Sequence, residues 1–115
     1  MRAAKRKNGR APPVSRARLE EMVEQATVDA NGESEEVTGW FTMIDEHLSL
    51  PFETKILGVP AVVMRVDLDR SDQIVAVCAR GRLRQAVPIL DLPLPKPPPG
   101  GAEWIEAYRV WRGDR

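Results

Sequence analysis

Acidic and amide side chains crowd one short segment of the chain, and their oxygen atoms are suited to binding a metal ion. Carboxylate, amide and backbone carbonyl oxygens are the ligands that hard divalent cations prefer. Calcium takes roughly 6–8 such oxygens in irregular geometry. Because a loop can supply this irregular arrangement, calcium is a better candidate than magnesium. The sequence therefore predicts a calcium site among Asp29, Asn31, Glu33, Glu35 and Glu36.

The spacing of this cluster does not fit an EF-hand. The Asp-x-Asn-x-Glu run that starts at Asp29 resembles the opening of an EF-hand loop. Such a loop requires a glycine at its sixth position and a bidentate glutamate at its twelfth. Those positions hold Ser34 and Trp40, so a calcium site here must be of another kind.

A second acidic cluster follows an apolar, β-branched run and contains Asp67, Asp69 and Asp72, with Ser71 between them. Alternation along a strand places Asp67 and Asp69 on the same face. The EF-hand pattern fails here too, because the closing glutamate would fall on Cys78. Both clusters also have a simpler interpretation, as a solvated acidic helix start and an Asp-rich β-turn that bind nothing.

Signals for catalysis are weak, and we predict that the protein is not an enzyme. The chain has one histidine and one cysteine, with no nucleophile motif and no phosphate-binding loop. Cys78 lies between Val77 and Ala79 in a strand-like run, where a buried structural thiol is expected. His47 falls near the end of a predicted helix, a position that the helix dipole favours.

The elements that position these residues begin with two helices. Ser15 is a suitable N-cap for a first helix with an apolar stripe, and Asn31-Gly32 breaks it. A second helix begins near residue 33 and ends before Pro51, which pushes Leu50 out of the helical region. Two helices with so short a connection form an antiparallel hairpin.

Beyond Pro51 the apolar period changes to that of β-strands. Strands are predicted over residues 52–58, 62–69, 73–80 and 82–90, with a hairpin around Gly81. A proline-rich connector, residues 91–101, precedes a last helix over residues 102–112 whose apolar side should dock on the core. We therefore predict an α+β fold with a helical hairpin, a small, strongly bent antiparallel sheet or partly open barrel, and a C-terminal helix.

Length and charge limit the remaining possibilities. The 115 residues suit one domain, which we place at residues 15–112 after a disordered basic arm, residues 1–14. The net charge of zero hides a block, residues 19–54, with ten acidic and no basic side chains. One cysteine, no secretory signal pattern and no membrane-spanning apolar run predict a cytoplasmic protein without disulfides, multi-cysteine zinc sites or membrane contact.

Residues 28–53 contain a series of short motifs, namely Asp29-Ala30, the acidic turn Glu33 to Glu36, Gly39-Trp40, Asp45-Glu46 with Leu48, and Pro51-Phe52. Through these motifs the segment resembles the CcbP family of small, calcium-binding proteins. The acidic strand end and the closing Trp-Ile-x-Ala-Tyr-x-x-Trp motif extend the resemblance over residues 19–112. It implies a helical hairpin packed on a small, strongly bent antiparallel sheet or SH3-like barrel. It also implies calcium bound without EF-hands, by carboxylates of the inter-helix turn and the acidic strand turn.

The leading prediction is accordingly a calcium-binding buffer or sensor, with a protein partner possible. The alternative is a non-enzymatic module that contacts nucleic acid or protein through the basic arm and Arg80, Arg82 and Arg84. Nucleic acid is the less favoured partner, because the helix pair is acidic and few aromatic side chains are available to stack on bases.

Overall fold

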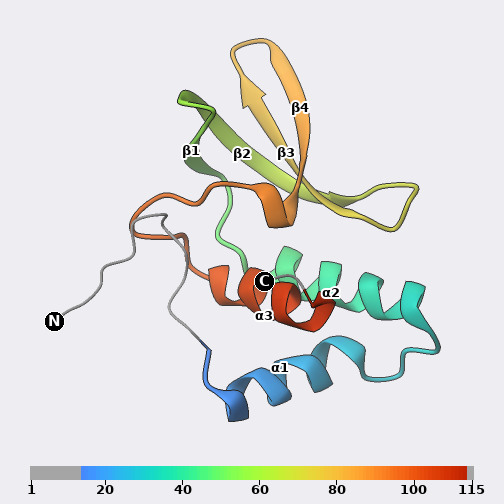
Figure 1. The fold of residues 1–115 in the computed structure, drawn as a ribbon. Helices are drawn as coiled ribbons and strands as arrows, with labels where there is room; N and C mark the ends of the chain where they lie inside the picture. Colours follow the sequence, from blue (N-terminus) through green and yellow to red (C-terminus); the bar gives the residue numbers. More distant parts are fainter. Residues whose placement is uncertain (1–13, 114–115) are drawn as a thin grey trace, which may run out of the picture.

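Three helices and a four-stranded sheet make up the computed structural model, which describes residues 14–113 (Figure 1). The elements in chain order are α1 (Arg16–Thr27), α2 (Glu33–His47), β1 (Phe52–Ile56), β2 (Val59–Leu68), β3 (Ile74–Arg80), β4 (Leu83–Pro88), the short 3-10 helix η1 (Ile89–Asp91) and α3 (Ala102–Arg112). The α+β class is confirmed. The predicted basic arm, apart from Val14, lies outside the described residues.

The sheet is antiparallel and open. Its strand order is β1-β2-β3-β4, with β1 and β4 at the edges, so the described strands do not close into the predicted barrel. The proline-rich connector runs along β1, where the Thr54 hydroxyl donates a hydrogen bond to the Pro93 carbonyl. Because proline has no backbone N–H, this segment covers the edge without adding a strand to it.

The two N-terminal helices are in close contact. The Ser15 hydroxyl accepts a hydrogen bond from the Arg18 backbone N–H at 3.1 Å, which confirms the predicted N-cap of α1. A Cβ atom on Gly39 of α2 would lie 1.8 Å from the Ala26 carbonyl oxygen of α1. Only glycine permits this approach, so the Gly39 position sets how closely α1 and α2 pack.

The helices form two layers beneath the sheet. Figure 1 shows α2 and α3 beside the sheet and α1 on their far side, so only the second helix of the predicted hairpin lies next to the sheet. Trp40 and Trp104 are buried between these elements, with ring centroids 6.1 Å apart in an edge-to-face arrangement. The predicted docking of the last helix is confirmed, since Tyr108 is also buried against Trp40.

Two contacts fix the position of α3. A Cβ atom on Gly101, just before the helix, would lie 2.1 Å from the His47 carbonyl oxygen, so this point of the chain abuts the end of α2. Farther along α3, the Arg109 side chain donates to the Leu90 carbonyl at 3.0 Å and lies 3.4 Å from Glu106. None of the described helices has the length and apolar content needed to cross a membrane.

Candidate metal site

The connection between α1 and α2 holds the first acidic cluster in a tight turn. Asp29 adopts a left-handed backbone conformation, with a φ of 65°, and its side chain is exposed. The Glu35 carboxylate accepts a hydrogen bond from the Asn31 backbone N–H at 2.8 Å. One predicted ligand, Glu35, therefore already helps to close the turn and to satisfy a backbone donor at the start of α2.

The turn between β2 and β3 holds the second cluster and is organised by one carboxylate. Asp69 Oδ1 accepts hydrogen bonds from the backbone N–H groups of Ser71 at 2.8 Å and Gln73 at 2.9 Å. Asp72 is left-handed, with a φ of 59°, which aspartate tolerates better than most residues. Asp67 lies apart on β2, with Oδ2 3.8 Å from Arg65.

The two clusters meet at one place, which we name the acidic depression. It is an open hollow of about 390 Å³. Glu33 and Ser34 come from the first turn of α2, while Ser71 and Asp72 come from the β2–β3 turn; the full lining is Glu33, Ser34, Val37, Ser71, Asp72 and Arg112. One carboxylate from each predicted cluster thus lines the same hollow, although the two are far apart in the sequence.

The other predicted ligands do not line this hollow, namely Asp29, Asn31, Glu35, Glu36, Asp67 and Asp69. Except for the half-buried Glu36, they are exposed. Within residues 14–113, no three His, Cys, Asp or Glu side chains lie close enough together to hold a metal ion. The oxygen chemistry of the hollow suits calcium, and two carboxylates with two serine residues are a partial ligand set.

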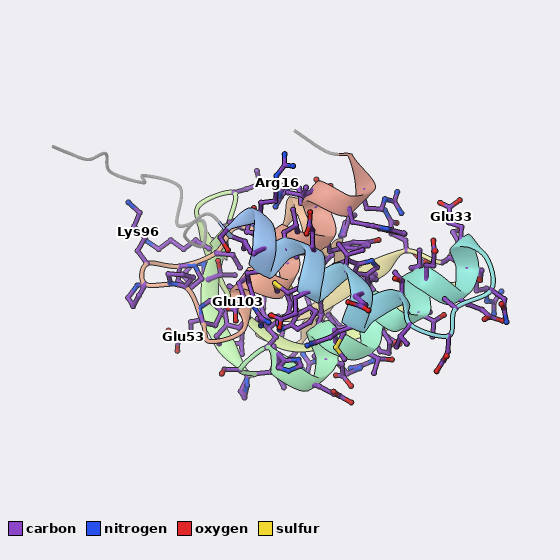
Figure 2. The ribbon with its side chains drawn as sticks, turned by 90° about the horizontal axis from the view of Figure 1, so that it is seen from below. Arg16, Glu33, Glu53, Lys96 and Glu103 are labelled. Carbon is purple, nitrogen blue, oxygen red and sulfur yellow. The ribbon has the colours of Figure 1, made fainter. Side chains whose placement is uncertain are left out.

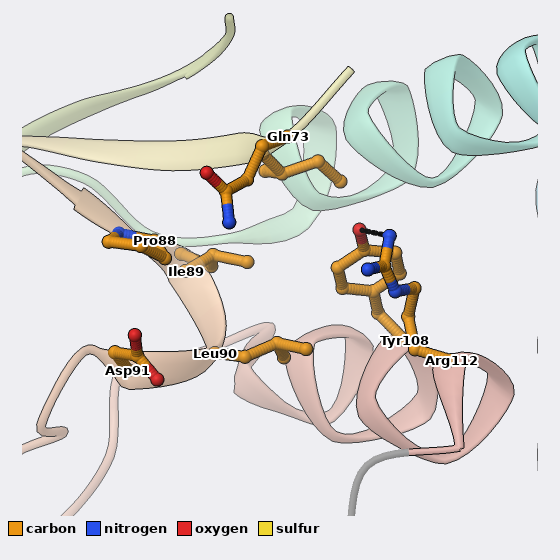
Figure 3. A pocket seen from close by; sticks show the side chains of 8 residues that line it. Gln73, Pro88, Ile89, Leu90, Asp91, Tyr108 and Arg112 are labelled. Carbon is orange, nitrogen blue, oxygen red and sulfur yellow. Dashed lines mark hydrogen bonds between the residues drawn. The ribbon is translucent and has the colours of Figure 1, made fainter. Parts of the chain in front are cut away.

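Arg112 is the residue of this site that the sequence analysis missed. It comes from the last turn of α3, and its guanidinium donates to the Tyr108 hydroxyl at 3.4 Å (Figure 3). Arg112 also lines a neighbouring cavity of about 110 Å³, together with Gln73 and Asp91. No local sequence signal connects Arg112 with Glu33, because only the packing of α3 brings them to one hollow.

The lone cysteine and histidine lie elsewhere. Cys78 is fully buried in β3, and burial raises the pKa of its thiol, which keeps the sulfur protonated and unreactive. His47 Nδ1 lies 2.8 Å from the Met43 carbonyl oxygen, and the His47 ring stacks on Trp104 with centroids 4.9 Å apart. Cys78 is thus a buried thiol and His47 lies at the end of a helix, as the sequence analysis predicted.

Comparison with known proteins identifies the family. The model of the CcbP family, described as calcium binding, matches residues 20–112, and the chain therefore belongs to this calcium-binding family. The matched region contains both acidic clusters and the acidic depression, and calcium is the ion that the family assigns. No curated protein and no solved structure matches the chain.

Proposed function

We propose that the protein binds calcium at the acidic depression, without an EF-hand, and acts as a calcium buffer or sensor. The observation that carries the proposal is the meeting of Glu33 and Asp72 in one hollow of a chain from a calcium-binding family. These two carboxylates are the central ligands, and the hydroxyl groups of Ser34 and Ser71 are available beside them.

The remaining predicted residues have supporting roles in this proposal. Glu35 and Asp69 hold the two turns in shape through the hydrogen bonds that their carboxylates accept. Asp29, Asn31, Asp67 and Glu36 do not line the hollow, so in this proposal they contribute negative charge or contact the ion through bridging water. The N-terminus of α2 carries partial positive charge, so the carboxylates of its first turn must also offset that charge before a cation is attracted.

Calcium binding would relieve repulsion that the fold now tolerates. The acidic block, residues 19–54, contains ten carboxylates and no basic side chain. A divalent cation between Glu33 and Asp72 replaces like-charge repulsion by two attractive interactions. Because the ion binds the folded chain and not the unfolded one, it stabilises the fold in proportion to the logarithm of its concentration.

The test is a calorimetric calcium titration of the full chain and of two double variants with equal charge changes. The first is Glu33→Gln with Asp72→Asn. The control is Asp45→Asn with Glu53→Gln; both of these residues are exposed, and Figure 2 shows Glu33 and Glu53 at opposite ends of the molecule. We expect the first pair to weaken calcium binding at least tenfold and the control pair to change it less than threefold.

Three outcomes are informative. The absence of any heat at millimolar calcium contradicts calcium binding by this chain, and an equal loss in both double variants contradicts the position of the site. A loss confined to the first pair supports the proposal. Terbium provides a second measurement, because tryptophan-sensitised emission that calcium displaces shows that the ion binds close to a tryptophan ring.

The change in tryptophan emission on calcium binding separates a buffer from a sensor. Arg112 lines the hollow and also contacts the Tyr108 ring, with its Cζ atom 5.8 Å from the centroid. An ion that moves Arg112 therefore perturbs the aromatic cluster around Trp40. A shifted emission spectrum supports a sensor, and an unchanged spectrum with bound calcium supports a buffer.

A further inference from the structure

Leu57 occupies a position that neither folding nor solubility explains. It lies in the turn between β1 and β2, 95% exposed, with a left-handed φ of 51°. That conformation is unfavourable for a leucine, whose Cβ atom crowds the following carbonyl oxygen, and is normally found at glycine, asparagine or aspartate. Two-residue hairpin turns favour Asn-Gly, whereas this turn has Leu57-Gly58. Leu57 is thus both exposed and strained, which makes its surroundings the place to look for a binding surface.

The second hairpin has a similar tip. Leu83, at the start of β4 and directly after the Gly81-Arg82 turn, is 65% exposed, and Val59 beside the first turn is 45% exposed. Because the four strands are antiparallel neighbours, both turns lie at the same end of the sheet. Figure 1 shows this end projecting away from the three helices. We name it the hairpin end of the sheet, comprising residues 54–60 and 79–86.

The hairpin end carries positive charge without any acidic side chain. Residues 54–60 and 79–86 contain no aspartate or glutamate, and their cations are Lys55, Arg80, Arg82 and Arg84; the exposed Glu53 of β1 borders this end. Neither segment contains a Phe, Trp or Tyr residue. The end therefore combines projecting aliphatic side chains with a basic surround and offers no aromatic ring for stacking on a nucleic-acid base.

We propose that the hairpin end docks on the surface of an anionic phospholipid bilayer. Leu57 and Leu83 would enter the interface between headgroups and acyl chains, and Lys55, Arg82 and Arg84 would lie at the level of the anionic headgroups. The convex shape of two projecting turns suits a deformable bilayer better than a flat protein surface. This peripheral contact does not span the bilayer, and it differs from the sequence-based prediction that the protein makes no membrane contact.

The experiment measures partition of the full chain onto phosphatidylserine–phosphatidylcholine vesicles and onto pure phosphatidylcholine vesicles, in EDTA to remove calcium. Leu57→Asn is the main variant, because asparagine suits the left-handed turn and should fold at least as well. Its matched control is Val28→Asn, which removes an aliphatic side chain that is 63% exposed in the α1–α2 connection. We expect Leu57→Asn to weaken partition about tenfold and Val28→Asn to leave it unchanged.

A second variant pair tests the charge. Arg82→Gln at the hairpin end is compared with Arg70→Gln in the β2–β3 turn, where the side chain is equally exposed. Removing one cation at an anionic surface should weaken partition about fivefold for Arg82 and have little effect for Arg70. All variants keep residues 1–13, so any attraction between the basic N-terminal segment and lipid is common to them.

Several results would overturn the inference. The first is equal partition onto both kinds of vesicle, and the second is an equal loss of partition for Leu57→Asn and Val28→Asn. The third is that the chain binds no vesicles and instead binds a single-stranded oligonucleotide in a salt-sensitive way that requires Arg82. The inference is supported if the chain binds anionic vesicles and if Leu57→Asn and Arg82→Gln weaken this binding while Val28→Asn and Arg70→Gln do not. Because the measurement contains no calcium, its outcome is independent of the proposed metal site.

Discussion

The acidic depression and the hairpin end of the sheet differ in charge and in how their turns are built. In the acidic turns, the left-handed residues are Asp29 and Asp72, whose short polar side chains tolerate that conformation. In the β1–β2 turn Leu57 and Gly58 both have a positive φ, which glycine tolerates and leucine does not. The carboxylates of Glu35 and Asp69 additionally serve the backbone of their own turns.

This difference shows that exposure alone does not identify a binding surface. Each exposed carboxylate of the acidic turns has a local structural reason to be there, so its role as a ligand needs independent evidence from family membership and from the meeting of Glu33 with Asp72. Leu57 has no such local reason. The overall charge of zero is uninformative, because the ten carboxylates of residues 19–54 are balanced by basic side chains spread over the rest of the chain.

The largest expected effect is on the free energy of unfolding, and it compares the packing around Gly39 of α2 with that around Gly58 at the hairpin end. Gly39→Ala should lower the free energy of unfolding by about 3 kcal/mol, because the new methyl group would overlap the Ala26 carbonyl and push α1 from α2. Gly58→Ala has open space around it and loses only the ease of a positive φ, about 1 kcal/mol. Urea unfolding of both variants measures the two losses of free energy, and equal losses would contradict tighter packing around Gly39 than around Gly58.

Calcium should stabilise the chain through the acidic depression alone. At a calcium concentration one hundredfold above its dissociation constant, the free energy of unfolding should rise by about 2.7 kcal/mol per ion. Thermal unfolding with calcium, with magnesium and with EDTA measures the shift. Leu57→Asn should retain the full shift, whereas Glu33→Gln with Asp72→Asn should lose most of it; a shift lost in Leu57→Asn would show that the two ends are coupled.

Relief of strain at the hairpin end should be detectable without any ligand. Leu57→Asn places an Asn-Gly pair in the β1–β2 turn and should raise the free energy of unfolding by about 0.5–1 kcal/mol. Chemical denaturation gives this value, with Leu83→Asn as a comparison, since Leu83 is exposed but is not in the left-handed conformation. A destabilised Leu57→Asn variant would mean that the leucine serves the fold.

The smallest effect concerns the sheet core that supports both ends. Burial raises the pKa of the Cys78 thiol above its usual 9.0, so the unfolded chain releases this proton at lower pH than the folded chain. The thiol's contribution to stability is complete below the unfolded pKa and declines as pH rises through the folded value. Denaturation across pH should therefore show a loss of stability above pH 9 that Cys78→Ala does not show. A difference that does not vary with pH would contradict this burial.

Local sequence signals predicted the elements well and their ends less well. The helices, the Gly81 hairpin and the docking of the last helix follow from apolar spacing and turn residues, and all are present. The helix α2 ends at His47 and not just before Pro51, because Gly101 abuts the His47 carbonyl. Strand β2 begins at Val59 and continues through Pro60, because it pairs with Ile56 and Lys55 of β1.

The candidate site was predictable as two clusters but not as one hollow. Each cluster is contiguous in sequence, so residue types and spacing were enough to select its oxygen ligands. The meeting of Glu33 and Asp72 depends on how α2 packs against the sheet, and the presence of Arg112 depends on α3. No pattern within either segment contains that information.

The sequence by itself determined the family, the oxygen-rich chemistry and the order of helices and strands, because these depend on residues close together in the chain. Tertiary structure alone decided that the sheet stays open, that one carboxylate from each turn lines a common depression, and that two aliphatic tips project from the same end. The physical reason is that these features arise from contacts between segments whose separation in sequence leaves no local trace.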